Sequence, residues 1–209
     1  MDNMKLEDLS IREFLAKTAS GSPVPGGGSV AALSAAIAAS LAEMVANLTI
    51  GKKGFEAKEE QMNDIVETAA EYRNKLIKDI ERDADSYNDV LTAFRLPKGN
   101  EQEEKIRKQA VQDAFKKASL VPLDVARNAF KIIELAEKVV KHGNKNAVTD
   151  GAVAVMMART AVLSALYNVK INLSSIKNVD FVERIRKDIT SLESEIKNKE
   201  REILSGVSI

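Results

Sequence analysis

The sequence predicts an all-α protein, a helical bundle in a single domain spanning residues 1–209. Apolar residues recur at three- and four-residue spacings through most of the chain. No segment alternates apolar and polar residues as a half-buried strand would, and no linker rich in proline and serine divides the chain. A chain of 209 residues has the ordinary size of one domain and can bury a substantial core.

The first expected helix covers residues 11–19 and is opened by a capping box. Ser10 and Glu13 have the required spacing, so each side chain can bond the backbone N–H of the other. A loop of prolines and glycines then leads into an alanine-rich helix that ends near Ile50. The segment Gly51-Lys-Lys-Gly54 stops that helix, with lysines near the negative end of the helix dipole.

The next expected helix is long, from about Glu56 to Phe94, and is broken by Leu96-Pro97-Lys98-Gly99. It carries a continuous apolar stripe: Met62, Ile65, Val66, Ala69, Leu76, Ile80, Tyr87, Val90, Leu91 and Phe94. A helix follows from Glu101 to Ser119, and Pro122 either kinks it or restarts it before it ends near Lys141.

Two helices complete the prediction. After a turn at residues 142–146, Thr149 is the expected N-cap of an apolar helix from Asp150 to about Leu173. The last helix starts near Asp180 and is amphipathic, with a narrow stripe formed by Val182, Ile185, Ile189, Leu192, Ile196 and Ile203. Such a narrow stripe is typical of packing on a partner helix, so we expect a homodimer.

Composition excludes several kinds of site. The 31 basic and 31 acidic residues cancel without a long run of one sign, so neither nucleic acid nor a charged membrane surface is an expected partner. Cysteine is absent and His142 is the only histidine, so we expect no metal site. Tryptophan is absent and aromatic residues are few, which argues against a stacking platform for single strands.

The apolar segment 30–50 has the length of a transmembrane helix, but Glu43, Asn47 and its many alanines and serines favour a buried helix of a soluble protein. The first residues lack the basic and apolar pattern of a signal peptide, so we expect a cytoplasmic protein.

The loop Pro23-Val-Pro-Gly-Gly-Gly-Ser29 is the most distinctive segment. Prolines keep the chain extended, and three glycines expose backbone amides at a helix N-terminus, where an anion or a carbonyl oxygen can bind. The same residues also form an ordinary break between helices, and on chemistry alone that interpretation is favoured. The glycines are not a dinucleotide fingerprint, because the residues before them are helical, nor a P-loop, because Gly-Lys-Ser/Thr is absent.

Asp83 is the strongest candidate for chemistry because it falls within the apolar stripe of the long helix. A carboxylate there is either buried against a ligand or a cation, or it lies at the edge of the stripe and pairs with a basic residue of the same helix. Asn168 and Asn172 lie one turn apart between apolar residues and need hydrogen-bond partners. Asp150 suits a helix N-terminus for electrostatic reasons alone.

Four stretches in this order resemble the cyclodeaminase/cyclohydrolase family of folate enzymes, which includes the C-terminal domain of formiminotransferase-cyclodeaminase. They are Pro25-Gly-Gly-Gly-Ser-Val-Ala-Ala32; Asp83-Ala-Asp-Ser-Tyr87 with Ala93-Phe-Arg-Leu-Pro-Lys98; Val121-Pro-Leu123; and Gly143-Asn144 with Thr149-Asp150 and Asn168-Val-Lys-Ile-Asn-Leu173. The resemblance covers about residues 10–175. Where the family has serine before the aspartate of the fourth stretch, this chain has Thr149.

The resemblance implies an all-α dimer that acts on the one-carbon unit of tetrahydrofolate, including polyglutamylated forms, with no cofactor besides this substrate. It makes Asp83 the catalytic acid/base and electrostatic stabiliser. It implies that the pterin or the glutamate carboxylates bind in a site formed by the following residues: Gly26, Gly27, Gly28, Ser29, Lys52, Lys53, Asn144, Asp150 and Asn168. The lysines are the candidates for the glutamate tail.

Three functions follow as hypotheses. The first is a cyclodeaminase that converts 5-formiminotetrahydrofolate to 5,10-methenyltetrahydrofolate and ammonia. The second is a cyclohydrolase that converts the methenyl compound to 10-formyltetrahydrofolate. The third, of a different class, is a helical folate-binding module without catalysis.

Overall fold

The computed structural model describes residues 4–208, and this part of the chain is helical without any strand. The prediction of an all-α fold is confirmed. Its α-helices are α1 (Ile11–Thr18), α2 (Gly27–Asn47), α3 (Glu59–Phe94), α4 (Glu101–His142), α5 (Val148–Leu173) and α6 (Val179–Ser205). Three short 3-10 helices accompany them at Leu6–Asp8, Glu56–Lys58 and Lys145–Ala147.

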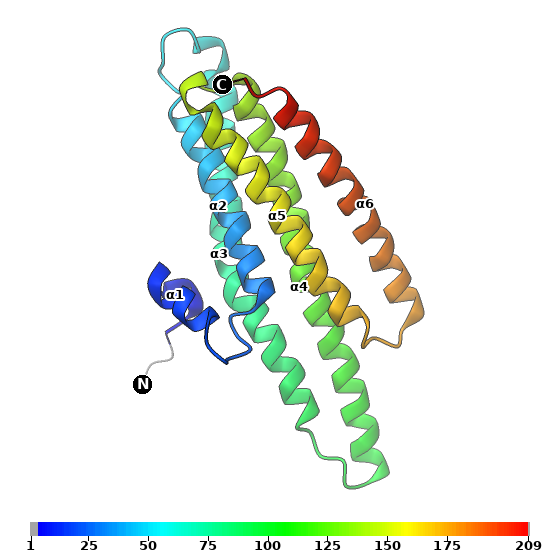
Figure 1. Cartoon of the computed structure of the whole chain (residues 1–209). Coiled ribbons are helices and arrows are strands. Elements are labelled where there is room, and N and C mark those ends of the chain that lie inside the picture. The colour runs from blue at the N-terminus through cyan, green and yellow to red at the C-terminus, as the bar shows by residue number, and fades with distance from the viewer. Residues whose placement is uncertain (1–3, 209) are drawn as a thin grey trace.

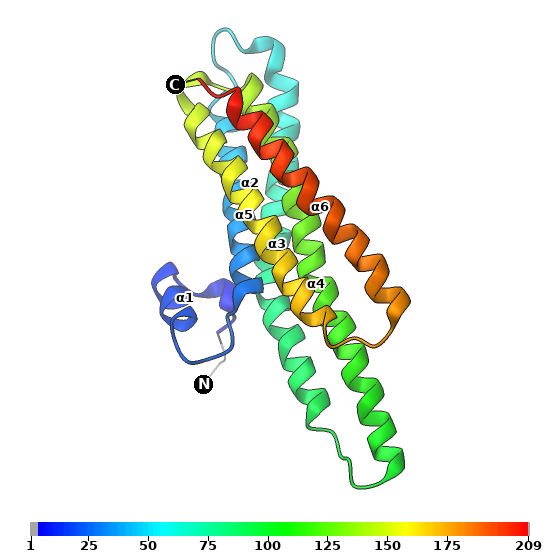
Figure 2. The same cartoon turned by 45° about the vertical axis from the view of Figure 1, so that its right-hand side comes forward.

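Helices α2 to α5 form an elongated bundle in which α2 packs against α3 and α5, and α4 packs against the same two helices. Helix α6 lies along the outside of α4 and α5, whereas α1 lies beside the N-terminal end of α2 (Figure 1, Figure 2). Helices α3 and α4 continue as a hairpin beyond the ends of α2 and α5 (Figure 1). The chain therefore places the start of α2 and the end of α5 together, partway along α3 and α4.

Alanine determines how closely the bundle packs. The inner face of α2 is lined by alanines that are fully buried, such as Ala35 and Ala42, and α5 contributes others, such as Ala158 and Ala165. Larger side chains fill the space opposite them, among them the buried Ile133 of α4. The distance between two packed helices depends on the size of the side chains between them. Because alanine has no atoms beyond Cβ, the backbones of α2 and α5 can approach their neighbours closely.

The capping box that was predicted for α1 is present, with both hydrogen bonds between Ser10 and Glu13. The predicted cap of α5 is wrong. Thr149 lies inside the first turn, because the 3-10 helix Lys145–Ala147 joins α5 directly and Asn144 caps that short helix instead. Helix α6 begins at Val179, next to the predicted start near Asp180, and the side chain of its N-cap Asn178 accepts a hydrogen bond from Phe181 N–H.

Pro122 does not divide α4, which runs without interruption from Glu101 to His142. A proline inside a helix removes one backbone hydrogen bond, and the helix continues only where the freed carbonyl finds another partner. Here that partner comes from α5, as described below.

Two helical segments, Gly27–Asn47 and Lys145–Leu173, are long and apolar enough to cross a membrane by length and composition. Of the most apolar window in each, 56% and 50% is buried inside the bundle. The buried half of each segment belongs to the core of the bundle, so the apolar composition of that half follows from packing. The apolar composition of the half that is not buried does not follow from packing within the bundle.

Candidate functional site

A cleft of about 470 Å³ opens where the glycine-rich loop and the start of α2 meet α3, α4 and α5. The loop contributes Pro23 and Val24, α2 contributes only glycine backbone, and α3, α4 and α5 supply further side chains. The remaining lining residues are Gly26, Gly27, Gly28, Asp83, Ser86, Tyr87, Val90, Leu91, Phe94, Phe115, Ala118, Asn168, Ile171 and Asn172. The predicted carboxylate and the predicted glycine loop thus lie in one cavity.

Gly28 lies directly against the carboxylate of Asp83. A Cβ atom built on Gly28 would fall 2.5 Å from Cγ of Asp83 and 2.6 Å from its Oδ2, closer than real side chains ever approach. Any side chain at this position would therefore force the Asp83 carboxylate to move, and glycine lets the two lie in contact. Gly27 has a milder constraint, since its Cβ would lie 3.2 Å from Nδ2 of Asn168.

Ser29 fastens the first turn of α2 to α3. Its hydroxyl lies 3.0 Å from the carbonyl oxygen of Ile80 and 3.2 Å from Oδ2 of Asp83, and the serine is fully buried. A hydroxyl has one proton, so it can donate to only one of these acceptors at a time. The backbone N–H of Ser29 also bonds the Asp83 carboxylate, which places that carboxylate at the positive end of the α2 dipole.

Burial raises the pKa of Asp83 above its ordinary value, because the charged form loses solvation in this apolar cleft. The hydrogen bonds from the side chain and backbone of Ser29 lower the pKa and only partly oppose this effect. Among residues 4–208 no basic side chain forms an ion pair with Asp83. A carboxyl group in such surroundings exchanges a proton more readily near neutral pH than an exposed one does.

The pairing with a basic residue of the same helix that the sequence left open for Asp83 is found instead at Asp79, which is buried. Asp79 lies one turn earlier on α3, where Nη1 of Arg82 is 3.1 Å from its Oδ1. Nη2 of Arg82 also pairs with Asp124 on α4 at 3.0 Å. This chain of charges joins α3 to α4 on a side of α3 that the cleft does not include.

Aromatic and aliphatic side chains form the walls of the cleft. The rings of Phe94 and Phe115 pack edge to face with centroids 6.0 Å apart, joining α3 to α4. Tyr87 and Ile171 lie at its mouth and are 39% and 68% exposed. Tyr87 and Phe94 were expected only as parts of an apolar stripe, and Phe115 and Ile171 were not predicted, because a stripe does not reveal which side chains line a cavity. The arrangement suits a flat, largely apolar ligand with a few polar atoms.

Four of the predicted site residues lie elsewhere. Lys52 and Lys53 are exposed in the loop after α2, about 30 Å from Gly28 given the rise of an α-helix, and Figure 1 shows that loop at the opposite end of the bundle. Asn144 is buried beside that loop, where its Nδ2 donates to the Leu48 carbonyl at 3.1 Å.

Asp150, in the first turn of α5, is about 27 Å from Asn168 along the same helix. Within one chain, the structure therefore brings Asn168 and Gly26–Ser29 to Asp83 but leaves Lys52, Lys53, Asn144 and Asp150 at the far end. Their predicted role in the site remains a prediction.

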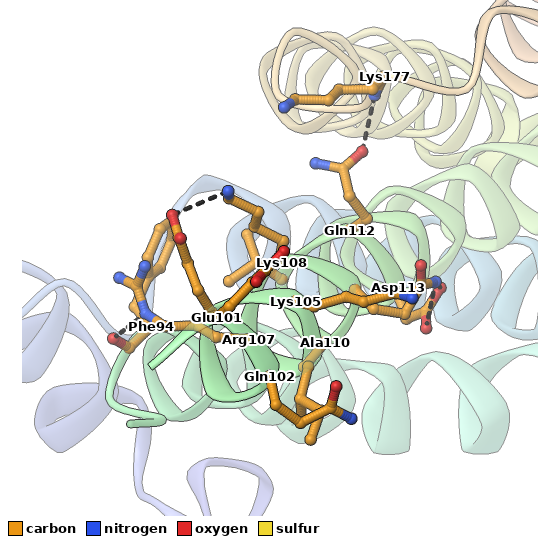
Figure 3. Close-up of a pocket in the computed structure, with 14 residues that line it drawn as sticks. Phe94, Glu101, Gln102, Lys105, Arg107, Lys108, Ala110, Gln112, Asp113 and Lys177 are labelled. Atoms are coloured by element: carbon orange, nitrogen blue, oxygen red, sulfur yellow. Dashed lines mark hydrogen bonds and ion pairs between the residues drawn. The ribbon is translucent and has the colours of Figure 1, made fainter. Parts of the chain in front are cut away.

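A second hollow, of about 1030 Å³, lies over the first turns of α4 (Figure 3). Its charged groups are largely satisfied by neighbours on the same hairpin: Lys108 pairs with Glu104 at 2.8 Å, and Nε of Arg107 donates to the Phe94 carbonyl at 3.1 Å. None of its lining residues is a buried carboxylate or amide. The larger hollow therefore lacks the chemical features of the cleft at Asp83.

Comparison with known proteins agrees with this geometry. The family model described as formiminotransferase-cyclodeaminase matches residues 10–191. The chain belongs to this family. Its members act on folates, and this protein is accordingly a folate-dependent enzyme of the cyclodeaminase/cyclohydrolase type.

Some relatives are named as cyclohydrolases and others as cyclodeaminases. The methenyltetrahydrofolate cyclohydrolase of Methylorubrum extorquens is 37% identical over 186 residues, which is 89% of each chain. The formimidoyltransferase-cyclodeaminase of Rattus norvegicus is 32% identical over 97% of this chain, which spans 37% of the rat protein. The crystal structure of formiminotetrahydrofolate cyclodeaminase from Thermotoga maritima has a TM-score of 0.87 and 32% identity, covering 97% of this chain and 98% of that one.

Gly28→Ala tests the close contact between α2 and Asp83. Alanine in place of a helical glycine ordinarily stabilises a protein by up to about 1 kcal/mol. Here we expect a loss of about 1–3 kcal/mol in the free energy of unfolding, because the new methyl group must displace the carboxylate or the helix. Denaturant unfolding measures this, and Gly21→Ala, which meets no atom within 4 Å, is the control. A Gly28→Ala protein as stable as the wild type would contradict the contact.

Asp83→Asn tests the electrostatics. The pKa of Asp83 is higher in the folded protein than in the unfolded chain. As pH rises above the ordinary pKa, the unfolded chain therefore loses this proton first, and the free energy of unfolding falls. Asparagine lacks this penalty, so the stability of the variant relative to the wild type should increase between about pH 4 and about pH 7. Urea unfolding at both pH values measures the difference. Asp85→Asn, at an exposed position of the same helix, is the control. An equal difference at both pH values would refute the raised pKa.

Proposed function

We propose that this protein is a formiminotetrahydrofolate cyclodeaminase with Asp83 as its catalytic acid and base. The observation that carries the proposal is the partly buried Asp83 carboxyl, unpaired with any cation in the described chain, at the inner end of an apolar cleft beside a helix N-terminus. The resemblance to the stand-alone Thermotoga maritima cyclodeaminase over nearly all of both chains supports this reaction.

The reaction needs one group that both donates and accepts protons. N10 of the substrate adds to the formimino carbon on N5, and the N10 proton must leave while the former imino nitrogen gains protons and departs as ammonia. The net change consumes one proton and leaves the 5,10-methenyl cation. Asp83 in its protonated form supplies the proton to the departing nitrogen, which a raised pKa favours near neutral pH.

Once it has given up its proton, the same carboxylate faces a cation. A fixed negative charge in a site of low dielectric stabilises an adjacent delocalised cation more strongly than it would in water. The hydrogen bonds from Ser29 hold the carboxylate in place for this role. One residue thus meets both requirements of the reaction.

Methenyltetrahydrofolate cyclohydrolase is the second candidate. It is favoured by the 37% identity to the Methylorubrum extorquens cyclohydrolase, which exceeds the identity to the cyclodeaminases. In that reaction water adds to the methenyl carbon, and Asp83 would accept a proton from the water as the ring opens. Both reactions pass through a tetrahedral carbon between N5 and N10, so the same cleft suits either.

We also propose that two copies of the chain associate through the outer faces of α2 and α5. The stripe of α6, on which the sequence analysis based the dimer, is buried against α4 and α5 of its own chain. The outer faces of α2 and α5 expose large apolar side chains, which lie on α2 and its C-cap (Ile37 41%, Met44 37%, Leu48 45%) and on α5 (Val153 45%, Met156 46%, Tyr167 70%, Ile171 68%). Soluble monomers rarely leave large apolar patches exposed, so this many large exposed apolar side chains on two packed helices favour an interface. On α2, Glu43 is the only charged residue, and it pairs with Arg73 at 3.0 Å. On α5, Lys170 lies over the Tyr167 ring and pairs with Glu193 of α6.

A second copy would also account for the divided set of predicted site residues. Identical patches associate about a two-fold axis, and an axis perpendicular to α2 places the ends of the two bundles in opposite directions. The end that carries Lys52, Lys53, Asn144 and Asp150 in one chain then lies towards the Asp83 end of the other. In such a dimer the lysines could bind the glutamate tail of the substrate.

Asp83→Asn tests the catalytic role. The wild type should produce the ultraviolet absorbance of the methenyl product from 5-formiminotetrahydrofolate, with release of ammonia. Asn can neither donate an acid proton nor carry charge, so we expect a loss of at least about a hundredfold in kcat, about 3 kcal/mol of transition-state stabilisation.

Methenyltetrahydrofolate assayed in parallel distinguishes the candidates. Loss of its absorbance faster than in buffer, without deamination of the formimino substrate, would favour the cyclohydrolase. Binding of folate without either turnover would replace the enzyme by a binding module.

Met156→Glu tests the dimer. A charge in the middle of an apolar interface is costly to bury, so the variant should sediment as a monomer where the wild type sediments as a dimer. Ile106→Glu is the control, because Ile106 is similarly exposed, at 54%, but lies on α4 away from the α2 and α5 faces. A monomeric wild type would refute the proposal.

A further inference from the structure

Pro122 leaves one carbonyl of α4 without a partner in its own helix. Proline has no N–H, so the carbonyl of Ala118, four residues earlier, cannot form its usual hydrogen bond. Ala118 is only 4% exposed, and an unpaired carbonyl in that position would be costly. Nδ2 of Asn172, on α5, donates to this carbonyl at 2.8 Å.

This bond fixes which way the Asn172 amide points. A carbonyl oxygen only accepts hydrogen bonds, so the amide nitrogen must face α4 and Oδ1 must face away from that carbonyl. Within residues 4–208 the Ala118 bond is the sole hydrogen bond of the Asn172 side chain. Asn172 and Ala118 both line the cleft that contains Asp83. Oδ1 of Asn172 is therefore a free acceptor at the cleft.

Asn168 has the same arrangement one turn earlier on α5. Its Nδ2 donates to the Ser164 carbonyl at 2.9 Å, and its amide lies against Gly27 at the start of α2. Residues four apart share one face of a helix, about 5–6 Å from each other. The cleft thus has two amide groups that each use one of their two N–H donors on a backbone carbonyl and whose Oδ1 acceptors are free. Such a wall can accept hydrogen bonds from a ligand that presents N–H groups.

We propose that Oδ1 of Asn172 binds an N–H group of the pterin ring, and that Pro122 is a positioning residue that holds this acceptor in place through the Ala118 carbonyl. The proposal rests on the proposed function, in which the cleft binds a tetrahydrofolate. A reduced pterin offers N–H groups at its 2-amino group, N3 and N8, so it meets acceptors better than donors. Pro122 has no other contact with the cleft, since it is not among the residues that line it.

Two substitutions separate binding from structure. Asn172→Ala removes the acceptor, and Pro122→Ala gives the Ala118 carbonyl a backbone N–H partner in its own helix, so that the Asn172 amide must compete for this carbonyl and is held less firmly. The probe is 5-formyltetrahydrofolate, an analogue that is not turned over by either proposed reaction. Its equilibrium dissociation constant is measured by calorimetry, with circular dichroism to establish that each variant is folded.

We expect each variant to weaken binding about tenfold, equivalent to about 1.4 kcal/mol, and the double variant to be little weaker than Asn172→Ala alone. Where turnover is measured, KM should rise much more than kcat falls, because neither residue takes part in proton transfer.

Gln112→Ala is the matched control. Gln112 also joins α4 to the segment after α5, through Nε2 to the Ser175 carbonyl at 3.0 Å and through Oε1 from Lys177 N–H at 2.7 Å, but it lies outside the cleft. Its loss should leave binding unchanged. A wild type that binds the probe, with Asn172→Ala or Pro122→Ala binding it within about threefold of the wild type, would overturn this inference alone. A wild type that does not bind the probe would overturn the proposed function with it.

Discussion

The contact between Gly28 and Asp83 is the constraint on which the rest of the site depends. Only a residue without a side chain lets the N-terminus of α2 lie against the α3 carboxylate, and Ser29 then fastens the two helices by bonding the Ile80 carbonyl and Asp83. This approach brings the positive end of the α2 dipole to a carboxylate that has no cationic partner in the described chain. The glycine-rich loop therefore helps to define the chemistry of Asp83 as well as to offer backbone amides to a ligand.

Stability and reactivity conflict at this site. Burial raises the pKa of Asp83 and makes its charged form unfavourable in the folded protein, which is the same property that makes it an effective proton donor. The two asparagines of α5 that line the cleft both donate hydrogen bonds to backbone carbonyls. Asn172 bonds the carbonyl that Pro122 leaves free, and Asn168 bonds the Ser164 carbonyl in its own helix. The polar groups that remain free are those a substrate could use.

The two most apolar helices, α2 and α5, have two different packing faces. Their inner faces are alanine-rich and form the core, whereas their outer faces expose large side chains such as Met156 and Tyr167. A helix that is apolar on all sides is buried on all sides, in a membrane or in a protein assembly. The exposed residue Ile171 belongs both to the outer face and to the cleft. In the proposed dimer, the second chain would therefore narrow the mouth of the site and exclude water from it.

The sequence by itself determined the helices, the capping box of α1 and the placement of Asp83 within an apolar stripe, because helical periodicity and capping depend on residues close in the chain. It left open whether Asp83 is buried or paired, and it grouped Lys52 and Asp150 with it. Only the tertiary structure decided these points, because the register in which α2, α3 and α5 pack determines which ends meet. The bond from Asn172 to Ala118 likewise joins residues 54 apart, and no local pattern encodes it.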